Sequence, residues 1–174
     1  MQRINIVGST GAGKSTFAKQ LAYKLGHPCI ALDELFWGAN WTPRPHDVFV
    51  ADVNIALSQP SWVCDGNYDN LRQLIWPRMD TMVWLDYAFP LVMWRVTKRA
   101  LTNLIHHNTI CNGNHDSWRR AFLSKDSVIF WSLTSFHRRR RKYLSLWHSP
   151  EFSRVTKVWL HTPQEAEVWL NQQP

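Results

Sequence analysis

One short segment near the amino end constrains the fold more than any other feature of the chain. Residues 8–15 read GSTGAGKS, which fits the pattern G-x-x-x-x-G-K-[ST], and Thr16 follows directly. An apolar run at residues 4–7 precedes this segment, and an amphipathic helical pattern at residues 14–25 follows it. Glycines in such a strand–turn–helix unit let backbone N–H groups converge on an anion. The sequence therefore predicts a phosphate-binding P-loop.

The P-loop pattern also predicts how a nucleoside triphosphate is held. The positive end of the helix dipole near Lys14 faces the phosphates, and the Lys14 ammonium reaches the β- and γ-phosphates. The hydroxyl of Ser15 is expected to bind Mg²⁺. We therefore expect ATP and Mg²⁺ as cofactors. The P-loop residues assigned to binding them are Gly8, Ser9, Thr10, Gly11, Ala12, Gly13, Lys14, Ser15 and Thr16.

Short apolar runs alternate with helical stretches along the rest of the chain, which predicts an α/β fold. Further strands are expected at 29–32, 61–64, 81–85 and 155–160, and helices at 45–57, 90–103, 128–146 and 163–170. We expect one domain over residues 1–174, with a five-stranded parallel sheet and helices on both faces. Two insertions would cover the site: residues 34–60 on the acceptor side, and the polar, lid-like segment 103–126.

Composition narrows the class of protein and its partners. Lys and Arg total 20 against 13 Asp and Glu, for a net charge of +7, which favours anionic partners without choosing among them. No apolar run approaches the roughly 20 residues of a membrane span, so no membrane partner is expected. The three cysteines are widely spaced and predict no disulfide framework. We expect a cytoplasmic protein that is a monomer or a small homo-oligomer.

Three acidic residues end predicted strands, where ligands bind in open α/β sheets. They are Asp33, Asp65 and Asp86. A carboxylate there can orient metal-bound water or accept a proton from an attacking hydroxyl, but it can also simply cap the next helix or turn. We favour a role in the site for Asp33 and Asp65, and a capping role for Asp86.

Basic residues after the fourth predicted strand are further candidates. Arg95 and Arg99 are four residues apart and share one helix face, which either clamps phosphates or is solvated. The run HRRRRK at residues 137–142 has three interpretations: contact with the transferring phosphoryl group, contact with nucleic acid, or an exposed face. Consecutive charges surround a helix, so at most two or three of them can point into a site.

The order of these motifs resembles that of the nucleoside monophosphate kinase group of P-loop proteins, which includes adenylate and shikimate kinases. It is more similar still to the bacterial DNA topology modulation or adenylate-kinase-like proteins. The likeness covers nearly the whole chain, and only the P-loop is specific by itself. Its other segments are LDELFW at 32–37, WVCDGNY at 62–68, VWLD at 83–86, Trp94-Arg95 with Arg99, and the late arginine run.

The resemblance implies roles for several residues. Asp65 and Gly66 match an Asp-Gly that lies near the metal and the acceptor in adenylate kinases. Arg95 and Arg99 match arginines that contact ATP. Arginines of the lid and of the segment after it gather round the phosphates, which makes Arg138 and Arg141 catalytic candidates. Arg119 and Arg120, within the predicted lid, are a second pair of candidates for these phosphate-contacting arginines.

The chain departs from this group on the acceptor side. Adenylate kinases continue after Asp-Gly with Phe-Pro-Arg, whereas Asn-Tyr-Asp stands at 67–69, so the acceptor phosphate loses its expected arginine. Arg44 and Arg72 are candidates to replace it. No Gly-Gly-Gly of the shikimate type follows the third strand, and the lid-like segment has no C-x₂-C pair for zinc. Trp37, Trp41 and Tyr68 either line the acceptor pocket or serve only in packing.

These observations lead to a functional hypothesis and an alternative. The leading hypothesis is transfer of the γ-phosphoryl group of ATP to a small acceptor, either a nucleotide or a hydroxylated metabolite. Lys14, Asp33, Arg138 and Arg141 would be catalytic, Ser15 and Asp65 would hold the metal, and Asp33 would orient or deprotonate the acceptor. Residues assigned to the acceptor are Asp33, Trp37, Arg44, Asp65, Gly66, Tyr68 and Arg72. The alternative is an ATP-dependent nucleic-acid-binding regulator with little or no kinase activity.

Overall fold

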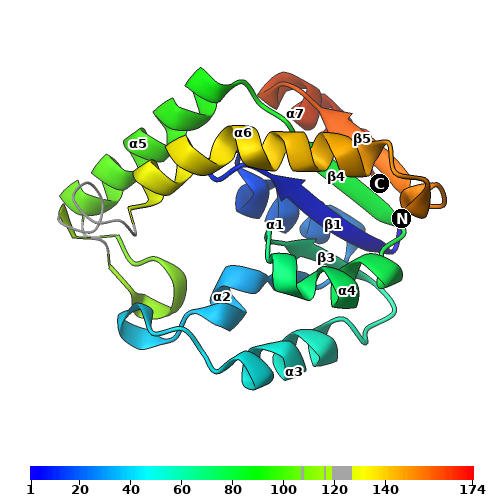
Figure 1. Cartoon of the computed structure of the whole chain (residues 1–174), viewed down its shortest axis with the longest axis horizontal. Helices are drawn as coiled ribbons and strands as arrows, with labels where there is room; N and C mark the ends of the chain where they lie inside the picture. Colours follow the sequence, from blue (N-terminus) through cyan, green and yellow to red (C-terminus); the bar gives the residue numbers. More distant parts are fainter. Residues whose placement is uncertain (107, 116, 119–126) are drawn as a thin grey trace.

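The sheet at the centre of the molecule has five parallel strands in the order β2-β3-β1-β4-β5 (Figure 1). A computed structural model describes residues 1–106, 108–115, 117–118 and 127–174 of the chain. The strands are β1 (Arg3–Gly8), β2 (Cys29–Ala31), β3 (Trp62–Asp65), β4 (Thr81–Leu85) and β5 (Thr156–Leu160). The predicted five-stranded parallel sheet is therefore confirmed. Because β1 lies in the middle, the P-loop that follows it emerges at the centre of the sheet edge.

Helices cover both faces of this sheet (Figure 1). They are α1 (Lys14–Leu25), α2 (Leu32–Phe36), α3 (His46–Ala56), α4 (Arg72–Ile75), α5 (Phe89–Ile105), α6 (Val128–Trp147) and α7 (Pro163–Asn171). Short 3₁₀ turns are η1 (Ala39–Trp41), η2 (Asp69–Leu71), η3 (Trp76–Arg78), η4 (Cys111–Gly113) and η6 (Pro150–Phe152). Within the described part of the chain, no helix combines the length and apolar character needed to cross a membrane.

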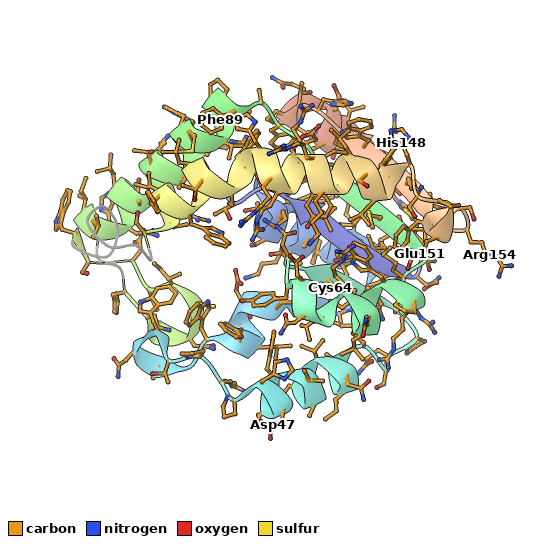
Figure 2. All side chains as sticks on the ribbon, in the orientation of Figure 1. Asp47, Cys64, Phe89, His148, Glu151 and Arg154 are labelled. Atoms are coloured by element: carbon orange, nitrogen blue, oxygen red, sulfur yellow. The ribbon has the colours of Figure 1, made fainter. Side chains whose placement is uncertain are left out.

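Two apolar cores result from the alternation of side chains along the strands. Ile4 and Ile6 of β1 lie in one core with residues of α1, α5 and α7. Val7 lies in the other core, which α3, α4 and the carboxyl half of α6 complete. Figure 2 shows side chains filling the space between the sheet and these helices. The sheet is thus fixed from both sides, and its carboxyl edge is a rigid base for the loops that follow β1, β3 and β4.

The acceptor-side insertion is more helical than the sequence suggested. β2 ends at Ala31, one residue earlier than predicted, and Leu32–Phe36 forms α2. The strand is short because it is at the edge and pairs only with β3. Asp33 therefore does not end a strand but lies in the first turn of a helix, where an acidic side chain interacts favourably with the helix dipole. Its backbone carbonyl accepts a hydrogen bond from the Trp37 N–H at 3.0 Å.

The predicted lid-like segment 103–126 is described only in part. It contains the last turn of α5, which ends at Ile105 rather than Asn103, and the turn η4. Arg119 and Arg120, the second candidate source of arginines, lie outside the described residues.

Candidate nucleotide and acceptor site

The P-loop joins β1 to α1 with backbone conformations that glycine alone accommodates readily. Gly11 has φ +86°, and a Cβ there would lie 2.3 Å from Cγ2 of Val96. A Cβ at Gly8 would lie 2.5 Å from the carbonyl oxygen of Leu85. The loop is therefore packed closely against β4 and α5, and a larger residue at either position would displace it. The predicted strand–loop–helix context of the P-loop is confirmed.

Lys14 begins α1 and curls back over the loop, where its Nζ donates a hydrogen bond to the Ser9 carbonyl at 3.2 Å. Burial lowers the pKa of Lys14. The carboxylates of Asp65 and Asp33 act in the opposite direction, and the positive charge of Arg139 lowers the pKa further. The charge of Arg99 acts in the same direction as that of Arg139. Two carboxylates and two guanidinium groups from four different elements thus act on the Lys14 ammonium.

Asp65, at the end of β3, is a suitable magnesium ligand beside the P-loop. Asp65 is only 6% exposed, and its carboxylate accepts a hydrogen bond from the Ser15 side chain. Burial raises the pKa of Asp65, although the nearby Lys14 ammonium lowers it. Among the described atoms, Oδ1 of Asp65 is buried without a hydrogen-bond partner. An orphaned carboxylate oxygen beside a hydroxyl fits Mg²⁺, which takes one or two protein oxygens and completes its shell with water and phosphates.

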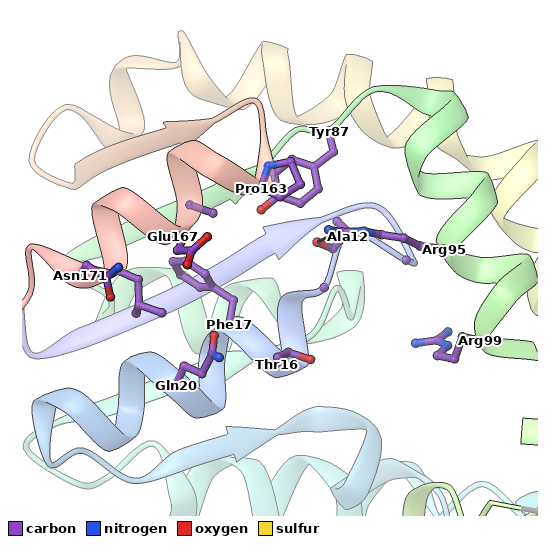
Figure 3. A pocket seen from close by; sticks show the side chains of 14 residues that line it. Ala12, Thr16, Phe17, Gln20, Tyr87, Arg95, Arg99, Pro163, Glu167 and Asn171 are labelled. Atoms are coloured by element: carbon purple, nitrogen blue, oxygen red, sulfur yellow. Dashed lines mark hydrogen bonds between the residues drawn. The ribbon is translucent and has the colours of Figure 1, made fainter. Parts of the chain in front are cut away.

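A cleft of about 560 Å³ opens on one side of the P-loop (Figure 3). Its walls come from the P-loop, α1, α5 and α7, and its size is that of a typical small-molecule site. The apolar wall includes Phe17 and Leu170, which suits the flat face of a nucleotide base. The lining residues are Gly11, Ala12, Gly13, Thr16, Phe17, Gln20, Tyr87, Arg95, Arg99, Pro163, Ala166, Glu167, Leu170 and Asn171.

Arg95 and Arg99 both extend from α5 toward the P-loop in this cleft (Figure 3). Arg95 donates from Nη1 to the Ala12 carbonyl at 3.4 Å, and its guanidinium carbon lies 5.5 Å from the centre of the Tyr87 ring. The charge of Arg99 contributes to lowering the pKa of Lys14. The shared helix face that the four-residue spacing predicts thus lines the cleft beside the P-loop, with Arg95 partly buried and Arg99 exposed.

On the other side of the P-loop, Asp33 and Tyr68 form a hydrogen-bonded pair. The Tyr68 hydroxyl donates to Oδ1 of Asp33 at 2.6 Å. Burial, and then the charge of Asp33, raise the pKa of Tyr68, so its hydroxyl keeps its proton and holds the carboxylate in place. The Tyr68 ring packs on Phe36 and Phe49 at centroid distances of 5.1 and 5.2 Å. Asp33 is thus positioned by a tyrosine that is itself anchored in the core.

The late arginine run lies on α6, and its members point in different directions. The buried stripe of this helix contains Ser132, Ser135, Phe136 and Tyr143. At 100° per residue, Arg139 falls within that stripe, and it is half-buried close to Lys14. The catalytic candidates named from sequence, Arg138 and Arg141, are exposed on the outer face instead. Arg139 is the partly buried arginine of the run; its charge acts on Lys14, and its guanidinium carbon lies 5.3 Å from the centre of the Trp131 ring. The spacing of the apolar stripe would have identified it.

Arg140 has a structural partner that the sequence did not predict. Its Nε lies 2.9 and 3.1 Å from the two oxygens of Asp86, whose side chain is only 3% exposed. Trp159 donates to the same carboxylate at 3.2 Å. The expectation that Asp86 caps the following helix is wrong. The N-cap residue of α5 is Ala88, and no side chain caps the first turn of this helix. Asp86 instead joins β4 to α6 and β5.

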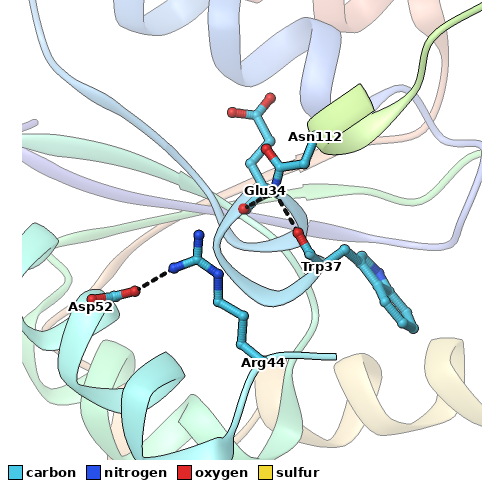
Figure 4. A network of polar contacts seen from close by, with 5 residues as sticks. All are labelled: Glu34, Trp37, Arg44, Asp52 and Asn112. Atoms are coloured by element: carbon cyan, nitrogen blue, oxygen red, sulfur yellow. Dashed lines mark hydrogen bonds and ion pairs between the residues drawn. The ribbon is translucent and has the colours of Figure 1, made fainter. Parts of the chain in front are cut away.

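The acceptor-side insertion and the described part of the lid-like segment are fastened together. We call the hydrogen-bonded contact between residues 34–41 and 111–115 the clasp. Asn112 donates to the Glu34 carbonyl at 2.7 Å, and the two residues lie side by side in Figure 4. Asn114 is 4% exposed; its amide donates to the Gly38 carbonyl at 2.9 Å, and its Oδ1 accepts from the Trp41 N–H at 2.8 Å. Sequence analysis missed both asparagines.

The remaining candidates for acceptor binding have partners of their own. Arg44 forms an ion pair with Asp52 of α3 at 2.8 Å (Figure 4). The guanidinium carbon of Arg72 lies 3.8 Å from the centre of the Trp76 ring. Trp37 meets Trp41 edge-to-face at 5.7 Å. The structure thus brings Asp33, Tyr68, Asp65 and Lys14 together, whereas Arg44 turns to α3.

Comparisons with known proteins bear on the fold. No protein-family model matches the chain, and no curated protein sequence is similar to it. The structure is similar to that of a shikimate kinase from Bacteroides thetaiotaomicron, with TM-score 0.53 at 18% identity over 98% of this chain and 95% of that chain. A gluconokinase from Sinorhizobium meliloti 1021 gives TM-score 0.49 at 18% identity, over 98% and 92% of the two chains. The chain therefore has the fold of the P-loop kinases.

Proposed function

We propose that the protein transfers the γ-phosphoryl group of ATP to a hydroxyl group of a small acceptor. The observation that carries this proposal is the pair of carboxylates near the P-loop: Asp65, which accepts a hydrogen bond from Ser15, and Asp33, which the Tyr68 hydroxyl holds at 2.6 Å. A protein that only bound nucleotide would need the P-loop, but it would not need a tyrosine-held carboxylate on the far side of it. Phosphoryl transfer requires both positioning of the reactants and cationic groups around the transferring phosphoryl group.

In this proposal each side chain has a defined task. The P-loop amides and Lys14 bind the phosphates, and Arg95 and Arg99 grip ATP from the cleft. Asp33 accepts the proton of the acceptor hydroxyl. At the same time the hydroxyl oxygen bonds to the γ-phosphorus, and the bond between the γ-phosphorus and the β,γ-bridging oxygen breaks, which releases ADP. Arg139 stabilises the charge that develops on the phosphoryl oxygens.

Mg²⁺ fits the residues at the end of β3. Asp65 and the Ser15 hydroxyl would hold it, and when bound it neutralises charge on the β- and γ-phosphates. The buried, unpaired Oδ1 of Asp65 supports this assignment. We therefore expect nucleotide binding to tighten with added Mg²⁺ in the native protein and to lose most of that dependence in Asp65→Asn.

The test is an ATP-consumption screen across nucleoside monophosphates, nucleosides and hydroxylated metabolites. Lys14→Ala serves as the blank, because it should abolish tight ATP binding while leaving the fold intact. Acceptor-dependent ADP formation by the native protein, absent in the blank, is the expected result. Unchanged ATP affinity in Lys14→Ala would refute the P-loop assignment itself.

Finer expectations from the sequence belong to the same proposal. They include ATP as the donor, one functional unit over residues 1–174, a cytoplasmic location, and a monomer or small homo-oligomer. The closer likeness to the bacterial DNA topology modulation or adenylate-kinase-like proteins also remains a proposal, supported by the order of motifs along the chain.

A nucleic-acid-binding role is the second candidate, and the outer face of α6 is the observation in its favour. Arg138 and Arg141 are exposed there, and Arg138 lies 5.9 Å from the exposed Trp131 ring. Basic residues next to an aromatic ring suit phosphates and bases. Binding to DNA that weakens steeply with salt, together with no ATP turnover on any acceptor, would favour this candidate.

A further inference from the structure

The charges around Asp33 indicate which class of acceptor the site fits. We propose that the acceptor is an uncharged, ring-bearing alcohol, of the nucleoside or hexose class, and not a phosphorylated or carboxylated compound. This inference rests on the proposed phosphoryl transfer and names its substrate class. Three features carry it: the pairing of basic side chains, the exposed Asp33 carboxylate, and the aromatic surfaces beside it.

Three basic side chains on the acceptor side each have a carboxylate partner. Arg44 pairs with Asp52 at 2.8 Å, and Lys19 pairs with Glu34 at 3.3 Å. Lys142 of α6 pairs with Asp69. Each pair is nearly neutral when seen from the acceptor site. A phosphate or carboxylate on the acceptor would have to draw one of these cations away from its present partner.

Among the described residues, Arg72 and Arg78 are further basic residues of this region, and Arg78 donates a hydrogen bond to Oδ1 of Asn54 in α3 at 2.7 Å. The guanidinium group of Arg72 stacks on Trp76, and Arg72 borders a small cavity together with Gly66, Tyr68 and Tyr143. Trp76 in turn packs edge-to-face on Phe152 at 5.0 Å. The described contact of the Arg72 guanidinium group is thus with the ring of Trp76, which is fixed in the core.

The Asp33 carboxylate is exposed, and its described hydrogen-bond donor is the neutral Tyr68 hydroxyl. An anionic acceptor placed beside it would be repelled, and the cations near Lys14 are needed for the phosphates of ATP. A neutral hydroxyl meets no such cost and can donate a hydrogen bond to the carboxylate. The electrostatics of the site thus select against a charged acceptor.

Aromatic rings next to Asp33 provide the complementary surface. Phe36 packs against Trp37 at 4.8 Å and against Tyr68 at 5.1 Å, and the clasp holds this segment in place. Trp37 and Tyr68 are half-buried, so part of each ring stays accessible. Such faces bind the flat side of a base or the C–H face of a sugar ring. A neutral ring with free hydroxyl groups satisfies both the rings and the carboxylate.

Phosphoryl transfer from radiolabelled ATP tests the proposal with matched acceptors. The uncharged set is adenosine, cytidine and glucose; the charged counterparts are AMP, CMP, glucose 6-phosphate, gluconate and shikimate. We expect the best uncharged acceptor to have a kcat/KM at least about tenfold above that of its charged counterpart. Comparison of adenosine and cytidine with glucose then shows whether the acceptor is a nucleoside or a hexose. A charged acceptor that is preferred would overturn this inference while upholding the proposed transfer. No transfer to any compound, despite Lys14-dependent ATP binding, would overturn both.

Asp33→Asn gives an independent readout. The quantity measured is kcat/KM for an uncharged acceptor divided by kcat/KM for its phosphorylated counterpart. Loss of base catalysis lowers both values alike and so leaves their ratio unchanged. Removing the carboxylate should lower that ratio about tenfold. Asp47→Asn is the matched control, since Asp47 is an exposed acid at the start of α3 on the outside of the molecule (Figure 2). A ratio that Asp33→Asn leaves unchanged, or that both variants lower equally, would refute selection by the Asp33 charge.

Discussion

The basic residues on the two sides of the P-loop differ in their partners. On the nucleotide side, Arg95 and Arg99 extend into a cleft of about 560 Å³, and the contacts described for Arg95 are with a backbone carbonyl and a tyrosine ring. On the acceptor side, Arg44 and Lys142 are ion-paired with carboxylates. Cations that are free to bind a polyanion thus lie on one side, and neutralised pairs lie on the other.

The difference concerns recognition more than stability. The pair of Arg44 and Asp52 is 41% and 34% exposed, and such pairs contribute only about 0.2–1 kcal/mol to folding. Their larger effect is on the local electrostatic potential, which decides the ligands that approach each side. Under the proposed function, ATP with its phosphates would lie on the side of α5, and a neutral acceptor on the side of α2. Arg139, whose charge acts on Lys14, would meet the phosphoryl group at the boundary between them.

The largest expected effect therefore falls on this boundary. Arg139→Ala should lower the rate of transfer about 10³-fold, as loss of an arginine that stabilises the transferring phosphoryl group typically does. Arg141→Ala changes the same residue type on the same helix, but on its exposed face, and should cost at least about 10²-fold less. Single-turnover rates at saturating ATP provide the comparison. Equal losses in both variants would mean that α6 does not present Arg139 to the phosphates.

A smaller effect is expected from the acceptor side alone. Asp33→Asn should lower transfer at least about 10²-fold, because the amide cannot accept the hydroxyl proton, while ATP binding stays nearly intact. Isothermal titration with a non-hydrolysable ATP analogue, measured beside the transfer rate, separates the two functions. A parallel loss of nucleotide affinity and transfer would assign Asp33 to the metal or to the structure, and the contrast between the two sides would be lost.

The P-loop side of the site could be predicted almost completely from local sequence. A strand, a glycine-rich turn and a helix are adjacent in the chain, so residues 8–16 needed no knowledge of tertiary contacts. The helix spacing of Arg95 and Arg99 was equally readable, and only the direction of that face was left open. The five-stranded sheet also followed from the alternation of apolar runs and helices, although α2 replaced the expected end of β2.

The acceptor side was harder to predict because its contacts join distant segments. The Asp86–Arg140 pair spans 54 residues and the Trp41–Asn114 contact spans 73, and no local pattern encodes either partner. Arg139 was within reach, since the stripe of Phe136 and Tyr143 determines the inward direction of α6. The choice of Arg138 and Arg141 came from the resemblance, whereas helical phase places both on the exposed face of α6.

The nucleotide side gives a third, intermediate prediction. Arg99→Ala should raise the KM for ATP about tenfold, corresponding to about 1.5 kcal/mol for one charge-assisted contact, and leave the acceptor KM unchanged. Lys98→Ala is the control, because Lys98 is exposed on α5 and lies 5.0 Å from the Trp94 ring, away from the cleft. Initial rates with each substrate varied in turn give both constants. An equal rise in the KM for ATP in both variants would show that the general charge of α5, and not the cleft, attracts ATP.

The smallest expected effect tests whether the clasp supports the acceptor side only. Asn114→Ala removes hydrogen bonds to the backbone of Trp41, Gly38 and Cys111, and each buried group left unsatisfied is costly, so the net loss in stability should be about 1–2 kcal/mol. For a chain of this size that lowers Tm by roughly 2–8 °C.

Loosening the wall that carries Trp37 should also raise the acceptor KM about threefold to fivefold, while the KM for ATP remains constant, since the nucleotide cleft is lined by α1, α5 and α7. The control is Asn108→Ala in the same connection, where Asn108 is exposed and hydrogen-bonds only locally to Asn103 among the described contacts. Differential scanning fluorimetry and the two KM values complete the comparison. If Asn114→Ala raised both KM values together, the clasp would support the whole site. The nucleotide side and the acceptor side would then differ in their charges but not in the contacts that hold them in place.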